Sequence, residues 1–224
     1  MSDIYIIGAS GHGREVLWLV EELISQGADF RLRGFVDDDE SLHGRNVCGH
    51  PVLGPVDMLA DLQHSSVALG IGLPQIRKKV LAKTRDLSLQ WPSLVAPSVR
   101  MSRHVEMGRG VTVFAGSVLT TQIELGDFSL VNVGCTISHD VVVAPGATLA
   151  PGTHLTGQTS VGDWAFVGTG ATVIPGVHVG EEAVVGAGSV VIRDVPAGAT
   201  VVGNPARIIK SGQDEASAPD SVEA

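Results

Sequence analysis

A spacing of six residues dominates the second half of the chain and constrains its fold more than any other feature. Counting in steps of six from Val95 to Val191, every position holds an aliphatic residue or a methionine. The series is Val95, Met101, Met107, Val113, Leu119, Leu125, Val131, Ile137, Val143, Leu149, Leu155, Val161, Val167, Val173, Val179, Val185 and Val191. A period of six fits neither an α-helix nor the simple alternation of a long strand. It predicts a solenoid in which three short strands and three tight corners make each coil.

The residues around each aliphatic position fit a parallel β-helix. The residue two positions earlier is mostly small or β-branched, as at Cys135, Ala147 and Thr153, which suits the narrow space beside a turn. Glycine often follows the aliphatic residue, as at Gly126 and Gly162, and supplies the dihedral angles of the corners. We therefore expect one aliphatic side chain per face to point inward and to stack on its equivalent in the next coil. Spacing alone does not set the handedness.

A glycine-rich turn lies between a short apolar run and a helical pattern at the N-terminus. Ile4 to Ile7 reads as a buried strand, and helical periodicity runs from Arg14 to Gln26. The turn between them, residues 8–13, has the sequence GASGHG. Backbone N–H groups and the positive end of the helix dipole meet at such a turn, which favours an anion such as a diphosphate. An ordinary tight turn is the alternative interpretation.

Two more strands complete a small parallel α/β domain of the Rossmann-like kind. The first, Leu32 to Val36, ends on Asp37 and Asp38, whose carboxylates can accept hydrogen bonds from a base or a ribose. The second, Ser66 to Leu69, is followed by a helix from about Pro74 to Thr84. This alternation predicts a ligand at the carboxyl ends of the strands. The glycine spacing differs from that of a dinucleotide fingerprint.

Composition narrows the classes of partner. The formal net charge of -9 argues against nucleic acid, whose binding depends on clustered Lys and Arg. Only two cysteines are present, Cys48 and Cys135, and the simplest account is a reduced, cytoplasmic protein. The first apolar run is interrupted at Gly8, so we expect neither a signal peptide nor a membrane span.

These patterns divide the chain into four segments. Residues 1–87 form the predicted α/β domain, and residues 88–94, which include Trp91-Pro92, form an extended linker. Residues 95–208 form the predicted β-helix, which we expect to end in an irregular cap after Val191. Residues 209–224 are predicted to be a disordered tail, because from Ser211 onward small and acidic residues prevail.

Four short motifs follow one another in order: GASGHG at residues 8–13, FVDD at 35–38, SHD at 138–140 and GNPAR at 203–207. Together they resemble the hexapeptide-repeat sugar acetyltransferases of the PglD and NeuD type, over residues 3 to about 208. The resemblance implies a left-handed β-helix, a homotrimer, and acetyl-CoA bound by the β-helix together with a catalytic histidine. It further implies that the N-terminal domain holds a nucleotide-linked sugar. No metal is expected in the site.

His139 is the candidate general base. With three hexads per coil, His139 lies at an outward corner in one column with Thr121, Gly157 and Pro175. A histidine whose pKa is near neutrality can take the proton that an attacking amine or hydroxyl must lose. Asp140 can hold the other ring nitrogen and stabilise the imidazolium. We expect direct transfer without an acyl-enzyme, because Cys135 falls in an inward position.

The remaining site residues follow partly from the resemblance. The cofactor contacts that it implies are Gly157, Thr169 and Ala187. Thr148 stands where many relatives carry a second histidine that contacts the thioester carbonyl, so that contact is in doubt. Arg207 and Lys210 are predicted to meet the 3′-phosphate of CoA, with a solvated chain end as the alternative. The predicted substrate-binding residues are Gly8, Ser10, Gly11, His12, Gly13, Arg14, Asp37, Asp38, Gly72 and Asn132.

The sequence thus predicts an enzyme that transfers an acetyl group from acetyl-CoA to the 4-amino group of a nucleotide-linked 6-deoxy sugar. Two alternatives remain open. One is O-acetylation of sialic acid or another sugar, and the other is a trimeric scaffold that binds a nucleotide without catalysis. The base of the nucleotide cannot be read from these residues.

Overall fold

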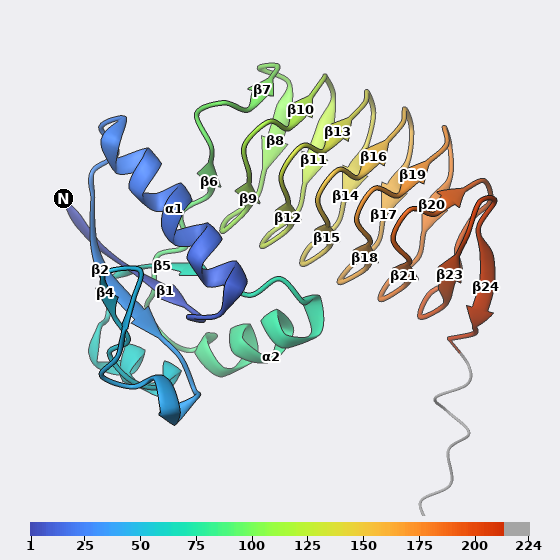
Figure 1. Cartoon of the computed structure of the whole chain (residues 1–224). Helices are drawn as coiled ribbons and strands as arrows, with labels where there is room; N and C mark the ends of the chain where they lie inside the picture. Colours follow the sequence, from blue (N-terminus) through green and yellow to red (C-terminus); the bar gives the residue numbers. More distant parts are fainter. Residues whose placement is uncertain (213–224) are drawn as a thin grey trace, which may run out of the picture.

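The computed structural model describes residues 1–212 and contains the two predicted parts, an α/β domain and a solenoid (Figure 1). In the first part, β1 (Ser2–Ile7) is the central strand of a parallel sheet of order β2-β1-β5. Its neighbours are β2 (Phe30–Val36) and β5 (Ser66–Leu69), and the helices are α1 (Gly11–Ser25) and α2 (Pro74–Thr84). Side chains of α1 pack on one face of this sheet and side chains of α2 on the other.

The N-terminal domain differs from the prediction in two places. Helix α1 begins at Gly11 and not at Arg14, because the chain already turns at Gly8, where φ is +99°, and Ser10 is the N-cap. The segment between β2 and β5 also contains structure that the sequence did not predict. It forms the hairpin β3 (Asn46–Val47) and β4 (His50–Pro51) with two 3₁₀ turns, η1 (Glu40–Leu42) and η2 (Val56–Asp61).

The solenoid is a left-handed parallel β-helix, as predicted. Each strand pairs with the strand one coil away, for example Val118 with Thr136 and Leu119 with Ile137, so each coil contains three hexads. The strands are β6 (Leu94–Val95), β7 (Arg100–Met101), β8 (Val105–Met107), β9 (Thr112–Val113), β10 (Val118–Leu119), β11 (Ile123–Leu125), β12 (Leu130–Val131), β13 (Thr136–Ile137), β14 (Val142–Val143), β15 (Thr148–Leu149), β16 (His154–Leu155), β17 (Ser160–Val161), β18 (Phe166–Val167), β19 (Thr172–Val173), β20 (His178–Val179), β21 (Val184–Val185) and β22 (Val190–Val191). They form three sheets, which are the three faces of the coil.

The period-six residues form the solenoid core. From Val113 to Val191 they are fully buried, and the small residues two positions earlier, such as Cys135, Ala147 and Thr153, are buried with them. Met101 is 45% exposed because no coil covers the first one. The corners are turned by residues with positive φ, mostly glycines but also Asp140 at +59°.

The end of the solenoid contains two paired strands in addition to the irregular connections predicted after Val191. Strand β23 (Thr200–Val202) adds to the sheet of β21, and β24 (Arg207–Lys210) returns antiparallel to it. Ile209 and Lys210, assigned to the tail from the sequence, therefore belong to a strand, because a returning strand pairs the open edge of the last coil. The rest of the predicted tail, from residue 213, lies outside the described residues.

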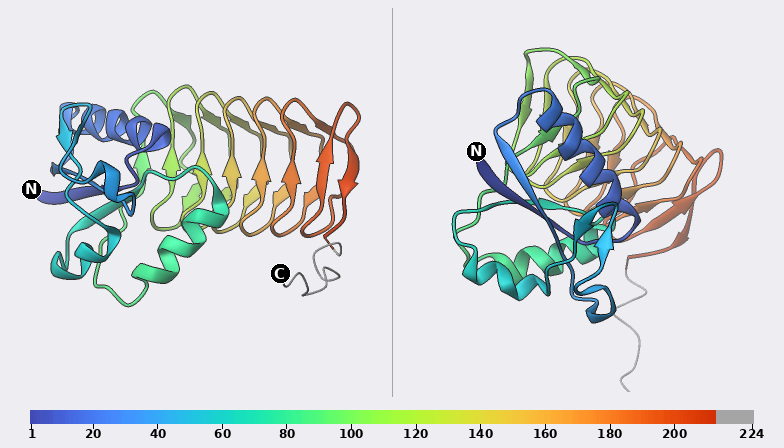
Figure 2. Two further views of the ribbon diagram at one scale, coloured as in Figure 1. Left: turned by 60° about the horizontal axis from the view of Figure 1, so that its bottom comes forward. Right: turned by 60° about the vertical axis from the view of Figure 1, so that its left-hand side comes forward.

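The two parts share a hydrophobic core. Leu94, Ala96, Phe114 and Leu130 of the solenoid belong to the same buried cluster as α1 and the sheet. Figure 2 shows α1 beside the first coils and α2 along coils further on, where Lys78 of α2 pairs with Glu182, while the last coils project beyond both helices. The division at residues 87 and 94 stays a prediction. Within the described residues, no helix is long and apolar enough to cross a membrane.

Candidate active site

A cavity of about 570 Å³ lies between the N-terminal domain and the solenoid. Two loops that follow β1 and β2 contribute to one side, together with the start of α2, and the solenoid wall forms the other side. Of the residues predicted to bind substrate or cofactor, the cavity is lined by Gly8, Ser10, Asp37, Asp38, Gly72, Asn132, Thr148 and Thr169. Apolar side chains cover much of the remaining wall, among them Ile71, Ile76 and Val80. Residues predicted separately from both halves of the chain thus meet at one cavity.

The glycines of the first turn allow three backbone segments to approach each other. A Cβ on Gly13 would lie 1.9 Å from the carbonyl oxygen of Gly8, and one on Gly8 would lie 2.9 Å from that of Gly70. Gly13 is buried and does not line the cavity. Its observed role is close packing of α1 against the preceding turn, of which Gly8 and Ser10 line the cavity.

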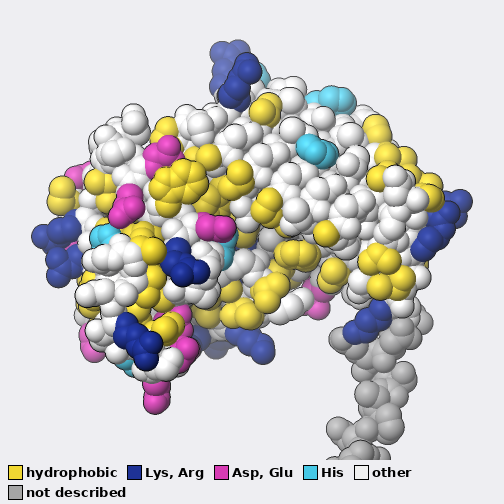
Figure 3. Space-filling model, in the orientation of Figure 1, with side chains coloured by type: hydrophobic (Ala, Val, Ile, Leu, Met, Phe, Trp, Pro, Cys, Tyr) yellow, Lys and Arg dark blue, Asp and Glu magenta, His cyan; other side chains and the backbone are white. Residues whose placement is uncertain are grey.

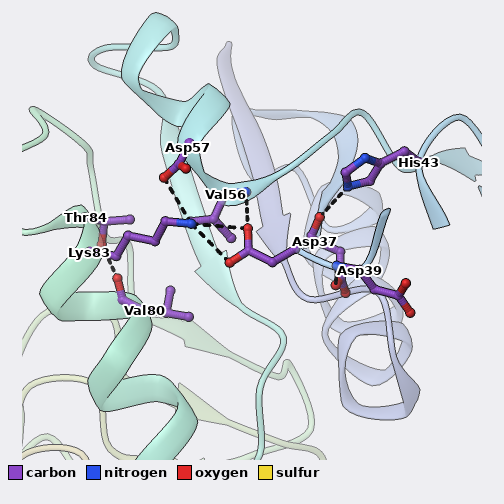
Figure 4. A network of polar contacts seen from close by, with 9 residues as sticks. Asp37, Asp39, His43, Val56, Asp57, Val80, Lys83 and Thr84 are labelled. Atoms are coloured by element: carbon purple, nitrogen blue, oxygen red, sulfur yellow. Dashed lines mark hydrogen bonds and ion pairs between the residues drawn. The ribbon is translucent and has the colours of Figure 1, made fainter. Parts of the chain in front are cut away.

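Asp37 and Asp38 have separate hydrogen-bond partners. Figure 4 shows Lys83 pointing toward Asp57 in this region. Asp37 accepts hydrogen bonds from the backbone N–H of Ala9, at 2.7 Å, and of Asp39, at 2.9 Å. It therefore fixes the glycine-rich turn to the end of β2. Its Oδ2 makes this contact, whereas its Oδ1 accepts the hydrogen bond from Asp39.

Asp38 belongs to a charged network at the edge of the cavity. It accepts a hydrogen bond from the N–H of Val56 at 2.9 Å and pairs with Lys83 at 3.1 Å, while Lys83 also pairs with Asp57 at 3.0 Å. Partial burial alone would raise the pKa of the Asp38 carboxyl, but these hydrogen bonds outweigh it and the pKa is lowered. Asp38 is thus held as a carboxylate facing the cavity.

His12 does not line the cavity. Its Nδ1 lies 2.7 Å from Oε2 of Glu15, and its ring lies beside Phe114 of the solenoid, with centroids 5.4 Å apart. Burial lowers its pKa, although Glu15 acts in the opposite direction. Nε2 is buried without a hydrogen-bond partner. Gly11 and Arg14 are exposed and also lie outside the cavity lining, so the substrate roles of these three residues stay predictions.

His139 lies at a solenoid corner, outside this cavity. Its Nδ1 is 2.7 Å from Oδ2 of Asp140, and its side chain is 58% exposed. An ionised carboxylate only accepts hydrogen bonds, so Nδ1 carries the proton and Nε2 is left as the basic atom. The imidazole lies over Gly157, as the column arithmetic predicted, because Gln158 N–H bonds to the carbonyl of His139 one coil away.

The proposed cofactor residues lie at different places. Thr169 and Ala187 occupy one exposed corner column, with Val133 and Pro151 before them. Thr148 is 2% exposed and its hydroxyl donates to the carbonyl of Gly72 at 3.2 Å. This hydrogen bond therefore links the solenoid to the N-terminal domain.

The end strand and the buried cysteine complete the predicted set. Arg207 is exposed in β24, where it donates to the carbonyl of Ala206, and Lys210 lies at the end of the same strand. Cys135 is fully buried, and burial raises the pKa of its thiol to about 11. This agrees with the expectation that Cys135 is not a nucleophile.

Sequence reasoning missed two residues of α2. Lys83 pairs with Asp38, and Arg77 is 2% exposed with its Nη2 donating to the carbonyl oxygens of Gly146 and Ala147. Burial lowers the pKa of Arg77 to about 10. The only available signal for Arg77 was its place next to Ile76 on a helix whose apolar residues are few, which does not distinguish a buried arginine from an exposed one.

Comparison with protein families agrees with the division into an N-terminal domain and a hexapeptide-repeat solenoid. Residues 3–84 match the PglD N-terminal domain, and residues 158–193 match the hexapeptide repeat of succinyl-transferase. One curated relative, an uncharacterised protein of Acanthamoeba polyphaga mimivirus, is 26% identical over 128 residues. The chain spans 24% of the length of that relative.

Three solved structures are similar over nearly the whole chain. A mutant of perosamine N-acetyltransferase from Caulobacter crescentus, in complex with CoA and GDP-perosamine, is 34% identical, with a TM-score of 0.84 and coverage of 94% of this chain and 98% of that one. The acetyltransferase domain of PglB from Neisseria gonorrhoeae, in complex with acetyl coenzyme A, is 31% identical, with a TM-score of 0.84 and coverage of 93% and 99%. WeeI from Acinetobacter baumannii is 33% identical, with a TM-score of 0.83 and coverage of 93% and 100%.

Proposed function

The chain belongs to the hexapeptide-repeat sugar N-acetyltransferases of the PglD type, and we propose that it acetylates the 4-amino group of a nucleotide-linked 6-deoxy sugar. Acetyl-CoA is the cosubstrate. The observation that carries the proposal is the cavity of about 570 Å³, in which the loops after β1 and β2 face Asn132 and Thr169 of the solenoid. A nucleotide held by the loops would extend its sugar toward the solenoid wall.

The amino group of a nucleotide-linked sugar is favoured over the hydroxyl of a sialic acid by two considerations. The similar perosamine N-acetyltransferase binds GDP-perosamine. In addition, the complete loop with Asp37 and Asp38 offers more to a nucleotide than a free sugar would need. The product would be a precursor for surface polysaccharide or glycan.

His139 is the proposed general base. Its Nε2 would take a proton from the amine as the new C–N bond forms, and the imidazolium would return that proton to the leaving sulfur as the C–S bond breaks. Asp140 would keep the ring in the correct tautomer and stabilise its positive charge. Gly157 leaves the space that the ring needs.

The proposed assembly is a C3 homotrimer with shared sites. The cavity of one chain is lined by no histidine, lysine or arginine among the described residues, so a histidine base must come from elsewhere. His139 projects from a different corner of the same solenoid and can complete the cavity of a neighbouring copy. Exposed apolar residues such as Val118, Val133 and Val142 lie on the solenoid. Figure 3 shows few charged side chains on the visible face of its middle coils, which supports contact with another copy.

A paired set of acceptors tests the proposed reaction. Purified protein is given acetyl-CoA and nucleotide-linked 6-deoxy sugars with GDP, UDP or dTDP, each in a 4-amino and a 4-hydroxy form. Release of CoA thiol is followed, and the product is identified by mass spectrometry. We expect rapid thiol release with one amino sugar and at least about a hundredfold lower rate with its hydroxy partner.

The alternatives give different results in the same assay. Transfer to hydroxyl acceptors, including a sialic acid, would indicate an O-acetyltransferase. Absence of thiol release with every acceptor would favour the trimeric scaffold. Two features support a cytoplasmic location for the proposed reaction. The cosubstrate is acetyl-CoA, and neither of the two cysteines is in a disulfide.

A further inference from the structure

Arg77 is the one charged residue among the buried residues that the structure describes. Its guanidinium has no carboxylate partner within that part of the chain; Nη2 donates to the main-chain oxygens of Gly146 and Ala147, and Nε has no partner. Its pKa of about 10 is still well above neutral pH, so the group remains a cation. A full positive charge therefore lies between α2 and the solenoid, compensated only by carbonyl dipoles.

Stability does not account for this arrangement. Moving a charge out of water is costly, and replacing buried charges by apolar residues of similar volume is often neutral or stabilising. Val80 on the same helix already packs against a buried apolar cluster. The buried charge is better explained by an effect on a ligand.

The adjacent cavity has no positively charged side chain in its described lining that could balance an anionic ligand. Among residues 1–212, the only charged residues that line it are Asp37 and Asp38, both acidic. The nearest lysine in the Asp38 network, Lys83, is already paired with two carboxylates. A nucleotide-linked sugar carries a diphosphate with two negative charges, so this cavity needs a source of positive potential.

Arg77 lies directly behind the cavity wall. On α2, it follows Leu73 by four residues and precedes Val80 by three, and helical residues at these spacings are neighbours. Both of those residues line the cavity, as does Thr148, which follows the carbonyl that Arg77 contacts. Only protein separates the charge from the cavity on this side, and salt screens buried charges much less than exposed ones.

We propose that Arg77 is the buried countercharge for the diphosphate of the nucleotide-linked sugar, acting through the cavity wall. The backbone N–H of Ser10, the N-cap of α1 that lines the cavity, would make a direct contact, and Arg77 would supply the net charge that this contact lacks. This inference rests on the proposed function, since it assumes a nucleoside diphosphate in the cavity. Arg77 is in this sense a positioning residue, not a catalytic one.

Binding measurements with and without the diphosphate test this role. The probes are GDP with guanosine, UDP with uridine and dTDP with thymidine, and calorimetry first identifies the pair whose diphosphate binds wild type most tightly. Arg77→Met removes the charge and keeps an apolar side chain. Lys78→Met is the matched control, because Lys78 is the next residue of α2, also cationic, but 47% exposed and paired with Glu182.

We expect Arg77→Met to weaken binding of the diphosphate by about tenfold and to change binding of the nucleoside less than about twofold. Lys78→Met should change both by less than about twofold, since exposed charges are screened. Equal weakening of both probes in Arg77→Met would make Arg77 a packing residue. Unchanged binding of the diphosphate would also overturn the proposal.

Wild-type protein provides a second test if Arg77→Met does not fold. Between about 50 mM and about 500 mM salt, a buried countercharge predicts that the preference for diphosphate over nucleoside falls less than about threefold. A steep loss of the preference would assign it to surface cations and contradict the proposal. Equal binding of the two probes by wild type would overturn the countercharge alone. Binding of no probe would overturn the proposed function as well.

Discussion

The imidazole of His139 lies against Gly157 of the next coil, so closely that a Cβ on Gly157 would be 2.5 Å from its Cε1 and Nε2. The position of the proposed base therefore depends on the absence of one methyl group. Gly157→Ala should keep the solenoid folded, because the clash is with a side chain that can move. It should lower kcat by about tenfold or more through displacement of the imidazole. Pro175→Ala, one coil further along the same column and exposed, is the control and should retain wild-type kcat.

Direct substitution of the base should have a larger effect. His139→Ala should lower kcat by about 10²- to 10⁴-fold with little change in the affinity for acetyl-CoA. Asp140→Asn should lower kcat less, because the base remains while its orientation is disturbed. Steady-state kinetics across the neutral pH range check both. Wild-type kcat in His139→Ala over that range would remove the general-base assignment.

Cys135 should be dispensable for the reaction. It is fully buried and its thiol has a pKa of about 11, so it cannot serve as an acyl carrier near neutral pH. Cys135→Ala should keep kcat within about twofold, and initial-velocity plots should converge, as expected for direct transfer in a ternary complex. Parallel plots, or loss of turnover in a folded Cys135→Ala, would indicate an acyl-enzyme.

Stability should depend on pH through His12. Burial lowers the pKa of His12 in the folded protein, so the unfolded chain binds more protons between that pKa and its ordinary value. The free energy of unfolding should consequently fall as the pH decreases below about 6.5, and be independent of this group above that value. Denaturant titrations of wild type and His12→Phe on both sides of that pH check this. His12→Phe should show a smaller dependence, whereas His104→Gln, at an exposed position, should match wild type.

Much of the fold could be predicted because each hexad repeats the same local sequence pattern. Val143, Leu149 and Val161 occupy equivalent places, so the pattern that identifies one coil identifies the others, and the columns containing His139 and Gly157 follow by counting. The strands and helices of the N-terminal domain could be predicted for the same reason, because local sequence patterns indicate them. The ends of these elements were harder to predict, since α1 begins at Gly11 through packing against Gly8.

The contacts between the two domains could not be predicted in this way. Arg77 and Gly146 are distant in sequence, and no local pattern marks an arginine that will be buried. The hydroxyl of Thr148 was expected near the cofactor. In the structure it donates a hydrogen bond to the carbonyl of Gly72, across the boundary between the two domains. The pairing of β23 with β24 likewise depends on the open end of the last coil, which is a tertiary feature.

Complementation between two inactive variants tests the shared site most directly. Asp38→Trp fills the cavity of its own chain, and His139→Ala removes the base, so each homotrimer should be inactive in acetyl transfer to the amino sugar. When the two are unfolded together in equal amounts and refolded, random C3 trimers should place an open cavity beside an intact His139 in roughly a quarter of sites. The account therefore predicts recovery of about a quarter of wild-type activity. Folded mixed trimers with no recovered activity would contradict it, because cavity and base would then belong to one and the same chain.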